Sequence, residues 1–315
     1  MVISVTRDGW IKRLPVDTFR SQGRGGRGII GATKKVDDMI KQLFVTSSHD
    51  YILFFSSRGQ IYRMKAYQVP QASRTAKGMP IVNLLQLGDA EKITATIPVK
   101  EFSDTVYLTM VTKEGTVKKT QLSQFDTNRK GGIRAITLDQ GDELRYVLLT
   151  DGRRDIIMAT KKGLSIRYDE KDVRAMGRNA AGVRGMMLNR GDEVIGADVV
   201  DDEAALLVIC ENGFGKRTLL KYYKKQKRGG KGILTIKVSE RNGDVIGIAV
   251  AGVDEELLMI SLNGIVIRQK IKDITATVGR STMGVRLMRM GEGDKVVAFE
   301  VFKKGEGEEE GEEGQ

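Results

Sequence analysis

One short stretch near the N-terminus combines the residue types that bind phosphate groups. It reads QGRGGRG and comprises Gln22, Gly23, Arg24, Gly25, Gly26, Arg27 and Gly28. Glycine lets a backbone approach a ligand closely, and each guanidinium stays positively charged at physiological pH. The stretch does not continue as Gly-Lys-Ser/Thr, which argues against a nucleotide P-loop. We therefore predict contact with the phosphates of a nucleic acid; the alternative is an ordinary tight connection between strands.

Composition favours a polyanionic partner. The 315-residue chain has a net charge of +11, and its last eleven residues hold six glutamates and no cation, so the rest carries +17. Such a basic body usually binds nucleic acid. The acidic tail, residues 304–315, cannot bury apolar area and is predicted to be disordered. A single cysteine, no secretory signal and no membrane-length apolar run favour the cytoplasm and no membrane partner.

Three sequence markers recur in register six times along the chain. A hairpin phrase of apolar strand, glycine-containing turn and basic strand returns at intervals of about 50 residues. Its glycines are Gly9, Gly59, Gly115, Gly163, Gly213 and Gly264. A second glycine, beside a cation, follows at Gly28, Gly78, Gly132, Gly182, Gly232 and Gly284. A Gly-Asp turn closes the last five units. The sequence therefore predicts a fold built from six similar units.

Each unit is predicted to be all-β. Its short apolar runs are separated by turn residues, and no segment sustains a helical stripe. Asp8-Gly9, Asn212-Gly213 and Asn263-Gly264 predict two-residue hairpins with positive φ at both central positions. About four strands per unit suit propeller blades, so we predict one six-bladed domain over residues 1–303. Its blades would span about 1–49, 50–104, 105–154, 155–203, 204–255 and 256–303. The chain opens directly on a strand, which suggests a piece of a longer protein.

Between the hairpin glycine and the second glycine, every unit carries cations. Because their phase is the same in each blade, we expect them at one equivalent place around the rim, where they would form a basic belt for duplex DNA. Few aromatic residues accompany them, so stacking on single strands is disfavoured. The alternative is scattered solubilising charge. The predicted rim residues are Arg20, Arg74, Lys77, Arg129, Lys130, Arg134, Arg178, Arg184, Lys227, Arg228, Lys231, Arg280 and Arg286.

We find no constellation for catalysis and predict no metal site. His49 is expected in a loop or strand end, and Cys210, on an apolar strand, is expected in the core. The aspartates of the Gly-Asp turns are expected to bond their own backbone. A second glycine-rich box, residues 226–232, has either a phosphate-binding or a purely structural role.

The six basic β repeats and the first box resemble the C-terminal domain of DNA gyrase A. The resemblance covers essentially the whole chain, including the acidic tail. The family motif is usually QRRGGKG; here Gly23 replaces one cation and Arg27 exchanges another. By position, residues 22–28 are assigned as the gyrase A box. The resemblance implies a β-pinwheel whose blades exchange strands, and a rim around which duplex DNA wraps.

The same resemblance implies a part in negative supercoiling without catalysis by this chain. The family's cleavage tyrosine lies in the N-terminal part of gyrase A, and ATP and Mg²⁺ act elsewhere in the holoenzyme. No cofactor is therefore expected here. The implied partners are double-stranded DNA, the rest of gyrase A and the gyrase B protein, in bacterial cytoplasm at the nucleoid. The alternatives are the matching domain of topoisomerase IV and, from another class, a protein- or ligand-binding propeller.

Overall fold

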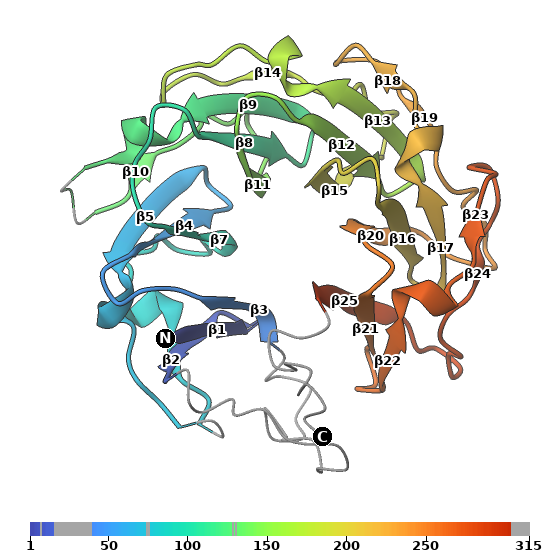
Figure 1. Cartoon of the computed structure of the whole chain (residues 1–315), viewed down its shortest axis with the longest axis horizontal. Helices are drawn as coiled ribbons and strands as arrows, with labels where there is room; N and C mark the ends of the chain where they lie inside the picture. The colour runs from blue at the N-terminus through green and yellow to red at the C-terminus, as the bar shows by residue number, and fades with distance from the viewer. Residues whose placement is uncertain (7, 16–39, 74–75, 128, 130, 304–315) are drawn as a thin grey trace, which may run out of the picture.

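The domain is an all-β ring of six small sheets (Figure 1). A computed structural model describes residues 1–6, 8–15, 40–73, 76–127, 129 and 131–303. The sheets follow one another around a central axis in chain order, so that the sixth returns to the side of the molecule where the first lies. In the part of the chain so described, no helix is long and apolar enough to cross a membrane.

Each repeat supplies three long strands to its sheet. The first strands are β1 (Val2–Thr6), β4 (Tyr51–Ser56), β8 (Tyr107–Thr112), β12 (Asp155–Thr160), β16 (Ala205–Cys210) and β21 (Glu255–Ser261). The second strands are β2 (Trp10–Leu14), β5 (Gln60–Lys65), β9 (Thr116–Gln121), β13 (Leu164–Asp169), β17 (Phe214–Leu219) and β22 (Val266–Lys270). The third strands, nearest the axis, are β3 (Ile40–Val45), β7 (Ile93–Val99), β11 (Leu144–Thr150), β15 (Val194–Val199), β20 (Val245–Ala251) and β25 (Val296–Lys303).

The outermost strand of each of the first five sheets comes from the following repeat. Such exchanged strands are short and pair with the second strand of the preceding unit. They are β6 (Met79–Pro80), β10 (Ile133–Arg134), β14 (Val183–Arg184), β18 (Lys225–Gln226), β19 (Ile233–Leu234), β23 (Ala276–Thr277) and β24 (Val285–Arg286). In the described part of the chain the sixth sheet has three strands and ends at β22. This exchange confirms the predicted pinwheel.

The hairpin turns differ from the predicted two-residue type. In the fourth repeat the Gly163 N–H donates to the Thr160 carbonyl over 3.0 Å, which closes a four-residue turn with the glycine last. Gly163 has φ +85°, whereas Asn212 and Asn263 do not have positive φ. The Leu164 N–H then donates to the Thr160 hydroxyl. A type I turn followed by a left-handed glycine explains the pattern, because one positive φ suffices for it.

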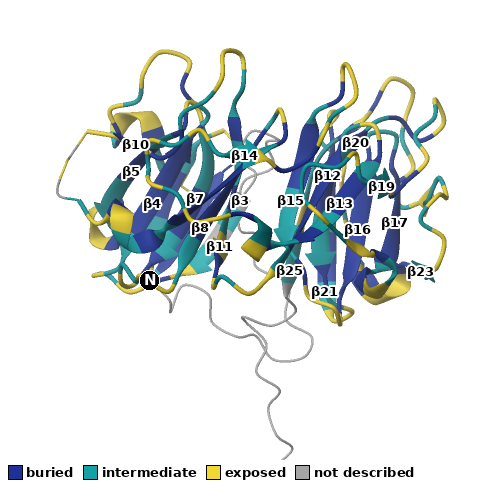
Figure 2. Cartoon of the chain, turned by 90° about the horizontal axis from the view of Figure 1, so that it is seen from above, coloured by how far each residue is buried: buried dark blue, intermediate teal, exposed yellow. Residues whose placement is uncertain are grey.

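The core lies between adjacent sheets. Five clusters of buried apolar side chains each join two neighbouring blades. Ile3 of the first sheet, for example, packs in one cluster with Phe54 of the second. Figure 2 shows the buried strands standing side by side with the exposed turns along their two ends. Because each blade buries its faces against its neighbours, blade order in the chain dictates which loops adjoin.

A single 3₁₀ turn follows the second strand in five repeats. These turns are η3 (Ala66–Gln68), η5 (Leu122–Phe125), η6 (Glu170–Asp172), η7 (Leu220–Tyr222) and η8 (Ile271–Asp273); η4 (Ile81–Asn83) follows β6 instead. Each of the five leads the chain from its own sheet towards the outer edge of the preceding one. They therefore stand immediately before the loops that carry the predicted rim cations.

Candidate nucleic-acid interface

Three arginines occupy equivalent places on exchanged strands at the outer edge. Arg134 lies opposite Gln60 in the β10–β5 pair, and Arg184 lies opposite Thr116 in the β14–β9 pair. Arg286 takes the same place in the β24–β17 pair. All three side chains are exposed. The common register follows from the repeat, since each arginine comes two residues after the second glycine.

The loops before these strands are pressed against the preceding blade. Gly182 and Gly284 have φ of +100° and +80°. A Cβ at Gly182 would lie 2.7 Å from the Val117 carbonyl oxygen, and one at Gly284 would lie 2.5 Å from that of Gly215. No side chain fits there without moving backbone, and positive φ disfavours one in any case. At these two positions the second glycine of the repeat is therefore required by strand exchange.

Two further arginines sit at the start of these loops. Arg178 and Arg280 each precede the second glycine by four residues and are half-buried. In the second repeat the described part of the same loop carries Lys77, whose ammonium lies 4.4 Å from the centre of the Trp10 ring. That contact gives Trp10 a packing role.

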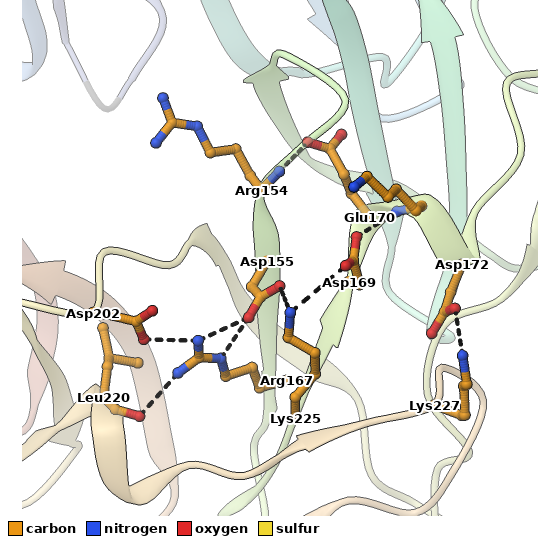
Figure 3. A network of polar contacts seen from close by, with 11 residues as sticks. Arg154, Asp155, Arg167, Asp169, Glu170, Asp172, Asp202, Leu220, Lys225 and Lys227 are labelled. Atoms are coloured by element: carbon orange, nitrogen blue, oxygen red, sulfur yellow. Dashed lines mark hydrogen bonds and ion pairs between the residues drawn. The ribbon is translucent and has the colours of Figure 1, made fainter.

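The second glycine-rich box is anchored to the fourth blade. The Lys227 ammonium lies 2.9 Å from the Asp172 carboxylate (Figure 3). Arg228 donates to the carbonyl oxygens of Asp172 and Arg184. Lys231 is exposed. Two of the three cations in this box thus have protein partners, which favours a partly structural role for the box.

A network beside this box joins the fourth and fifth blades. The Arg167 guanidinium lies 2.7 Å from the carboxylates of both Asp155 and Asp202 and donates to the Leu220 carbonyl (Figure 3). Lys225 completes it, with its ammonium 2.7 Å from Asp155. Arg167 and Asp155 are nearly buried, so their pairing stabilises the contact between blades rather than a ligand.

We call the described rim residues the outer cations. They are Lys77, Arg129, Arg134, Arg178, Arg184, Lys227, Arg228, Lys231, Arg280 and Arg286. Within the described chain, only Lys227 of this set forms an ion pair with a carboxylate. Arg20, Arg74, Lys130 and the gyrase A box, residues 22–28, lie outside the described residues. A line of positive side chains without local countercharges attracts an extended polyanion.

A second series of cations lies within the strands, and no separate role was predicted for it from the sequence. We call these residues the strand cations; each follows its hairpin glycine by four positions. They are Arg13, Arg63, Lys119, Arg167, Arg217 and Arg268.

Five of the six strand cations hold protein groups, whereas two guanidinium nitrogens of the buried Arg217 have no hydrogen-bond partner in the described chain. Arg13 donates to the Val69 carbonyl at the end of η3 over 2.7 Å, and the Lys119 ammonium donates to the Glu170 carbonyl in η6 over 2.8 Å. Arg63 pairs with Asp126 beside η5. Their constant place, four residues after each hairpin glycine, is the signal that would have separated them from the rim residues.

Buried lysines form a third series that sequence reasoning missed. Lys118 and Lys216 are 0% and 1% exposed. Burial, followed by repulsion from Arg178, lowers the pKa of Lys118 to about 8. Burial, followed by repulsion from Arg280, lowers the pKa of Lys216 to about 8 as well. Both ammonium groups donate to carbonyl oxygens of the loops that bear these arginines.

The residues considered for other chemistry have structural surroundings. Cys210 is fully buried in the core as predicted, and burial raises the pKa of its thiol to about 12. His49 lies in the turn between β3 and β4. Asp192 accepts from the Glu193 N–H as predicted, and also from that of Lys162 in the hairpin turn. In the described part of the chain no cluster of histidine, cysteine and carboxylate side chains could hold a metal ion.

Sheet order, strand exchange and edge charge together define a six-bladed β-pinwheel with a basic outer edge. The sequence profile described as DNA gyrase C-terminal domain, beta-propeller, matches residues 1–47, 50–100, 107–151, 154–201, 205–251 and 255–303. The chain therefore belongs to the family of DNA gyrase C-terminal domains. Its six matched segments fall on the six repeats.

Curated relatives agree with this family. A DNA gyrase A protein from Clostridium acetobutylicum is 48% identical over 309 residues, which cover 98% of this chain and 37% of that protein. The DNA gyrase A protein from Haloquadratum walsbyi is 43% identical over 320 residues, covering 100% of this chain and again 37% of the relative. The chain thus spans little more than a third of the length of these relatives.

Two solved structures share the architecture. The structure of a DNA gyrase A C-terminal domain matches with a TM-score of 0.74 and 27% identity, over 96% of this chain and 99% of the other. The C-terminal domain of DNA topoisomerase IV matches with a TM-score of 0.83 and 23% identity, over 96% and 93%. The second likeness, at its lower identity, shows the shared fold alone.

Proposed function

We propose that this domain binds duplex DNA along its outer edge, bends it around the ring, and so supports negative supercoiling by a gyrase holoenzyme. The observation that carries this proposal is the phased row of exposed arginines on exchanged strands, typified by Arg134, Arg184 and Arg286. They lack carboxylate partners among the described residues, so they are available to phosphates. Scattered solubilising charge would not produce one register on three blades.

The size of the bending energy explains why many contacts are needed. Bending about 20–30 base pairs by about 40–90° costs roughly 1–6 kcal/mol. A single exposed ion pair contributes about 0–1 kcal/mol, which cannot offset that cost. Each phosphate that is neutralised also releases condensed counterions, and this gain accumulates along the belt. A ring of similar loops therefore suits a bent duplex better than one isolated basic patch would.

Residues 22–28 are assigned to the gyrase A box, which we propose holds one end of the wrapped DNA. Support comes from the repeat phase: the box ends at Gly28 as the other loops end at their second glycines. The sixth sheet, whose described part ends at β22, is the blade that neighbours the first in the ring. DNA entering or leaving the belt there would meet the densest glycine and arginine sequence in the chain.

The chain is proposed to act without catalysis of its own, together with the rest of gyrase A and with gyrase B in the bacterial cytoplasm. It would bring the segment to be transported to the cleavage site, while ATP and Mg²⁺ are used elsewhere in the holoenzyme. The domain itself would need no cofactor. Support comes from the gyrase A relatives, which extend well beyond the region matched by this chain.

The decisive experiment reads the topology of bound DNA. A nicked circle is bound by the domain, ligated and freed of protein, and its linking number is measured. Wrapping of one handedness gives a shift that grows with protein concentration and disappears at high salt. Tight binding without any linking-number shift would contradict wrapping. It would favour either a straight DNA contact or the protein-binding propeller that the sequence left open.

The matching domain of topoisomerase IV is distinguished by the holoenzyme. Joined to the rest of a gyrase A protein and mixed with gyrase B, this domain should support introduction of negative supercoils into relaxed DNA. If the chimaera only relaxes and decatenates DNA, the topoisomerase IV alternative gains support. The 43–48% identity to gyrase relatives favours the first outcome.

A further inference from the structure

Every second blade carries a buried lysine in its second strand. Three positions after the hairpin glycine, the first, third and fifth repeats carry lysine, whereas the others carry tyrosine or isoleucine. The lysines are Lys12, Lys118 and Lys216. The outer loops alternate in step: those of the odd repeats contain a Gly-Gly pair, whereas those of the second, fourth and sixth repeats do not. Strand exchange lays each loop without the pair on the blade that carries a lysine.

Lys118 contacts the loop of the fourth repeat from beneath. Its ammonium donates to the Arg178 carbonyl and, over 2.6 Å, to that of Ala135. The side chain has no solvent exposure, so these acceptors replace the water that the charge has lost. Lys118 thus holds the backbone of Arg178 by a hydrogen bond from the interior of the third blade, while the Arg178 side chain is half-buried at the outer edge of that blade.

The other two lysines repeat this arrangement. Lys216 donates to the carbonyls of Gly279 and Arg280 over 2.9 and 2.6 Å. Lys12 donates to the Ala76 carbonyl over 2.8 Å, next to Lys77. Three contacts of one kind, on three alternate blades, show a repeated device rather than an isolated buried charge.

The fifth repeat shows what happens without such a lysine. There the loop lies on the fourth blade, whose equivalent position is Ile166. Its Arg228, placed like Arg178 and Arg280 four residues before the second glycine, donates to two carbonyls and thereby anchors its own loop. In the described chain neither Arg178 nor Arg280 has a side-chain hydrogen bond or an ion pair. The lysine anchors the loop in place of the guanidinium.

We propose that Lys12, Lys118 and Lys216 are positioning residues for DNA binding: each anchors the loop of the next even-numbered repeat, so that the cation of that loop can contact a phosphate. The inference rests on the proposed function. A buried ammonium costs stability that an apolar side chain of similar shape would not, and its presence on alternate blades calls for a role outside the core.

The test compares Lys118→Met with a matched neighbour. Lys119 is also buried and donates to a backbone carbonyl, but its acceptor Glu170 lies in η6 and not in the outer loop. DNA affinity of the 315-residue chain is measured over a series of KCl concentrations, because the slope counts contacted phosphates. Lys118→Met should lower the slope by about 0.9, as Arg178→Ala should. Lys119→Met should lower the unfolding free energy and leave the slope unchanged.

A double variant separates positioning from general stability. In the double variant Lys118→Met, Arg178→Ala the salt slope of DNA binding should fall no further than in either single variant, because both substitutions remove the same phosphate contact. Additive losses, or an equal loss in Lys119→Met, would overturn the proposal. Circular dichroism establishes that each variant is folded. If Lys118→Met does not fold, Lys12→Met, whose lysine is the most exposed of the three, tests the loop bearing Lys77 in the same way.

Hydrogen exchange distinguishes failure of this inference from failure of the proposed function. In the absence of DNA, amides of residues 178–182 should exchange faster in Lys118→Met than in Lys119→Met. Unchanged exchange would overturn the positioning role whatever the DNA affinity. Faster exchange with an unchanged salt slope in both Lys118→Met and Arg178→Ala would instead show that the loop is positioned but does not contact DNA.

Discussion

The strand cations and the outer cations carry the same charge in opposite surroundings. Arg167 is nearly buried between two carboxylates and a carbonyl of the next blade. Arg184, on the exchanged strand β14, is exposed and has no carboxylate partner in the described chain. The first is neutralised by the protein, and the second needs an external anion. Total charge therefore overstates the part of this domain that can act on DNA.

The difference arises from position along one hairpin. A strand cation lies where the second strand passes under the turn of the next blade, and carbonyls at the ends of these turns need donors. An outer cation lies on an exchanged strand or in the loop before it, at the outer edge of the preceding sheet. Pairing with protein groups is consequently frequent in the first series, as in Arg13, Arg63 and Arg167, and ion pairs are rare in the second, where Lys227 alone of the described members has one.

Replacement of Arg24 and Arg27 by alanine should abolish supercoiling by a reconstituted holoenzyme, while DNA binding weakens only several-fold. Residues 22–28 belong by repeat phase with the outer cations, so their loss should affect the wrapped path more than simple association. Supercoiling is read on agarose gels, and ATP-independent relaxation serves as the control. Full supercoiling activity would show that the assigned box is not required.

Removal of three outer arginines should weaken DNA binding by about two orders of magnitude at about 0.1 M salt. The triple variant is Arg134→Ala, Arg184→Ala and Arg286→Ala. Its affinity should also depend less steeply on salt, with a slope smaller by about 2.7, while the midpoint of urea unfolding stays close to that of the parent. A wild-type slope would mean that these arginines face solvent and not phosphate.

Arg167→Met should lower the stability of the domain and leave its DNA binding unchanged, the reverse of the triple arginine variant. It leaves buried Asp155 with Lys225 alone and removes a donor from the Leu220 carbonyl. We expect a loss of about 3 kcal/mol in unfolding free energy, measured by urea titration, with the salt slope of DNA binding unchanged. A reduced slope in the folded variant would place Arg167 among the residues that contact DNA and would contradict its assignment to the contact between blades.

Stability should rise with pH because of Lys118 and Lys216. Their folded pKa of about 8 lies below the unfolded value of 10.5, so above pH 8 the unfolded chain binds more protons. Between about pH 8 and pH 9 each lysine should add about 1 kcal/mol to the unfolding free energy. The double variant Lys118→Met, Lys216→Met should lose this gain in denaturant titrations at the two pH values. An equal rise in parent and variant would contradict the burial of these charges.

Deletion of residues 305–315 should raise DNA affinity a few-fold at low salt. The deleted segment carries six glutamates, which would compete with phosphates for the outer cations. The effect should vanish as salt increases. A variant with the six glutamates replaced by glutamine is the control for length, and equal affinity of all three proteins would leave the segment without an influence on binding.

The sequence by itself predicted much of this domain. Glycines in register marked six units, and apolar runs of strand length marked their strands, because turn and strand preferences act locally. The pinwheel came from family resemblance and is confirmed by β10, β14 and the other exchanged strands. The hairpin type was wrong at Asn212 and Asn263, where a left-handed glycine at the end of a longer turn makes a second positive φ unnecessary.

The sequence could not predict which cations are paired within the protein and which are exposed at the outer edge. In the sequence Lys118, Lys119 and Arg184 are all basic residues in or beside a short strand. In the ring, Lys118 lies beneath an outer loop, Lys119 reaches a 3₁₀ turn, and Arg184 stands on the outer edge. Local propensity cannot separate them, because their surroundings come from the neighbouring repeat, about fifty residues away. The repeat in the sequence determined the blades, and the packing of one blade on the next determined whether each cation is buried and paired or exposed at the outer edge.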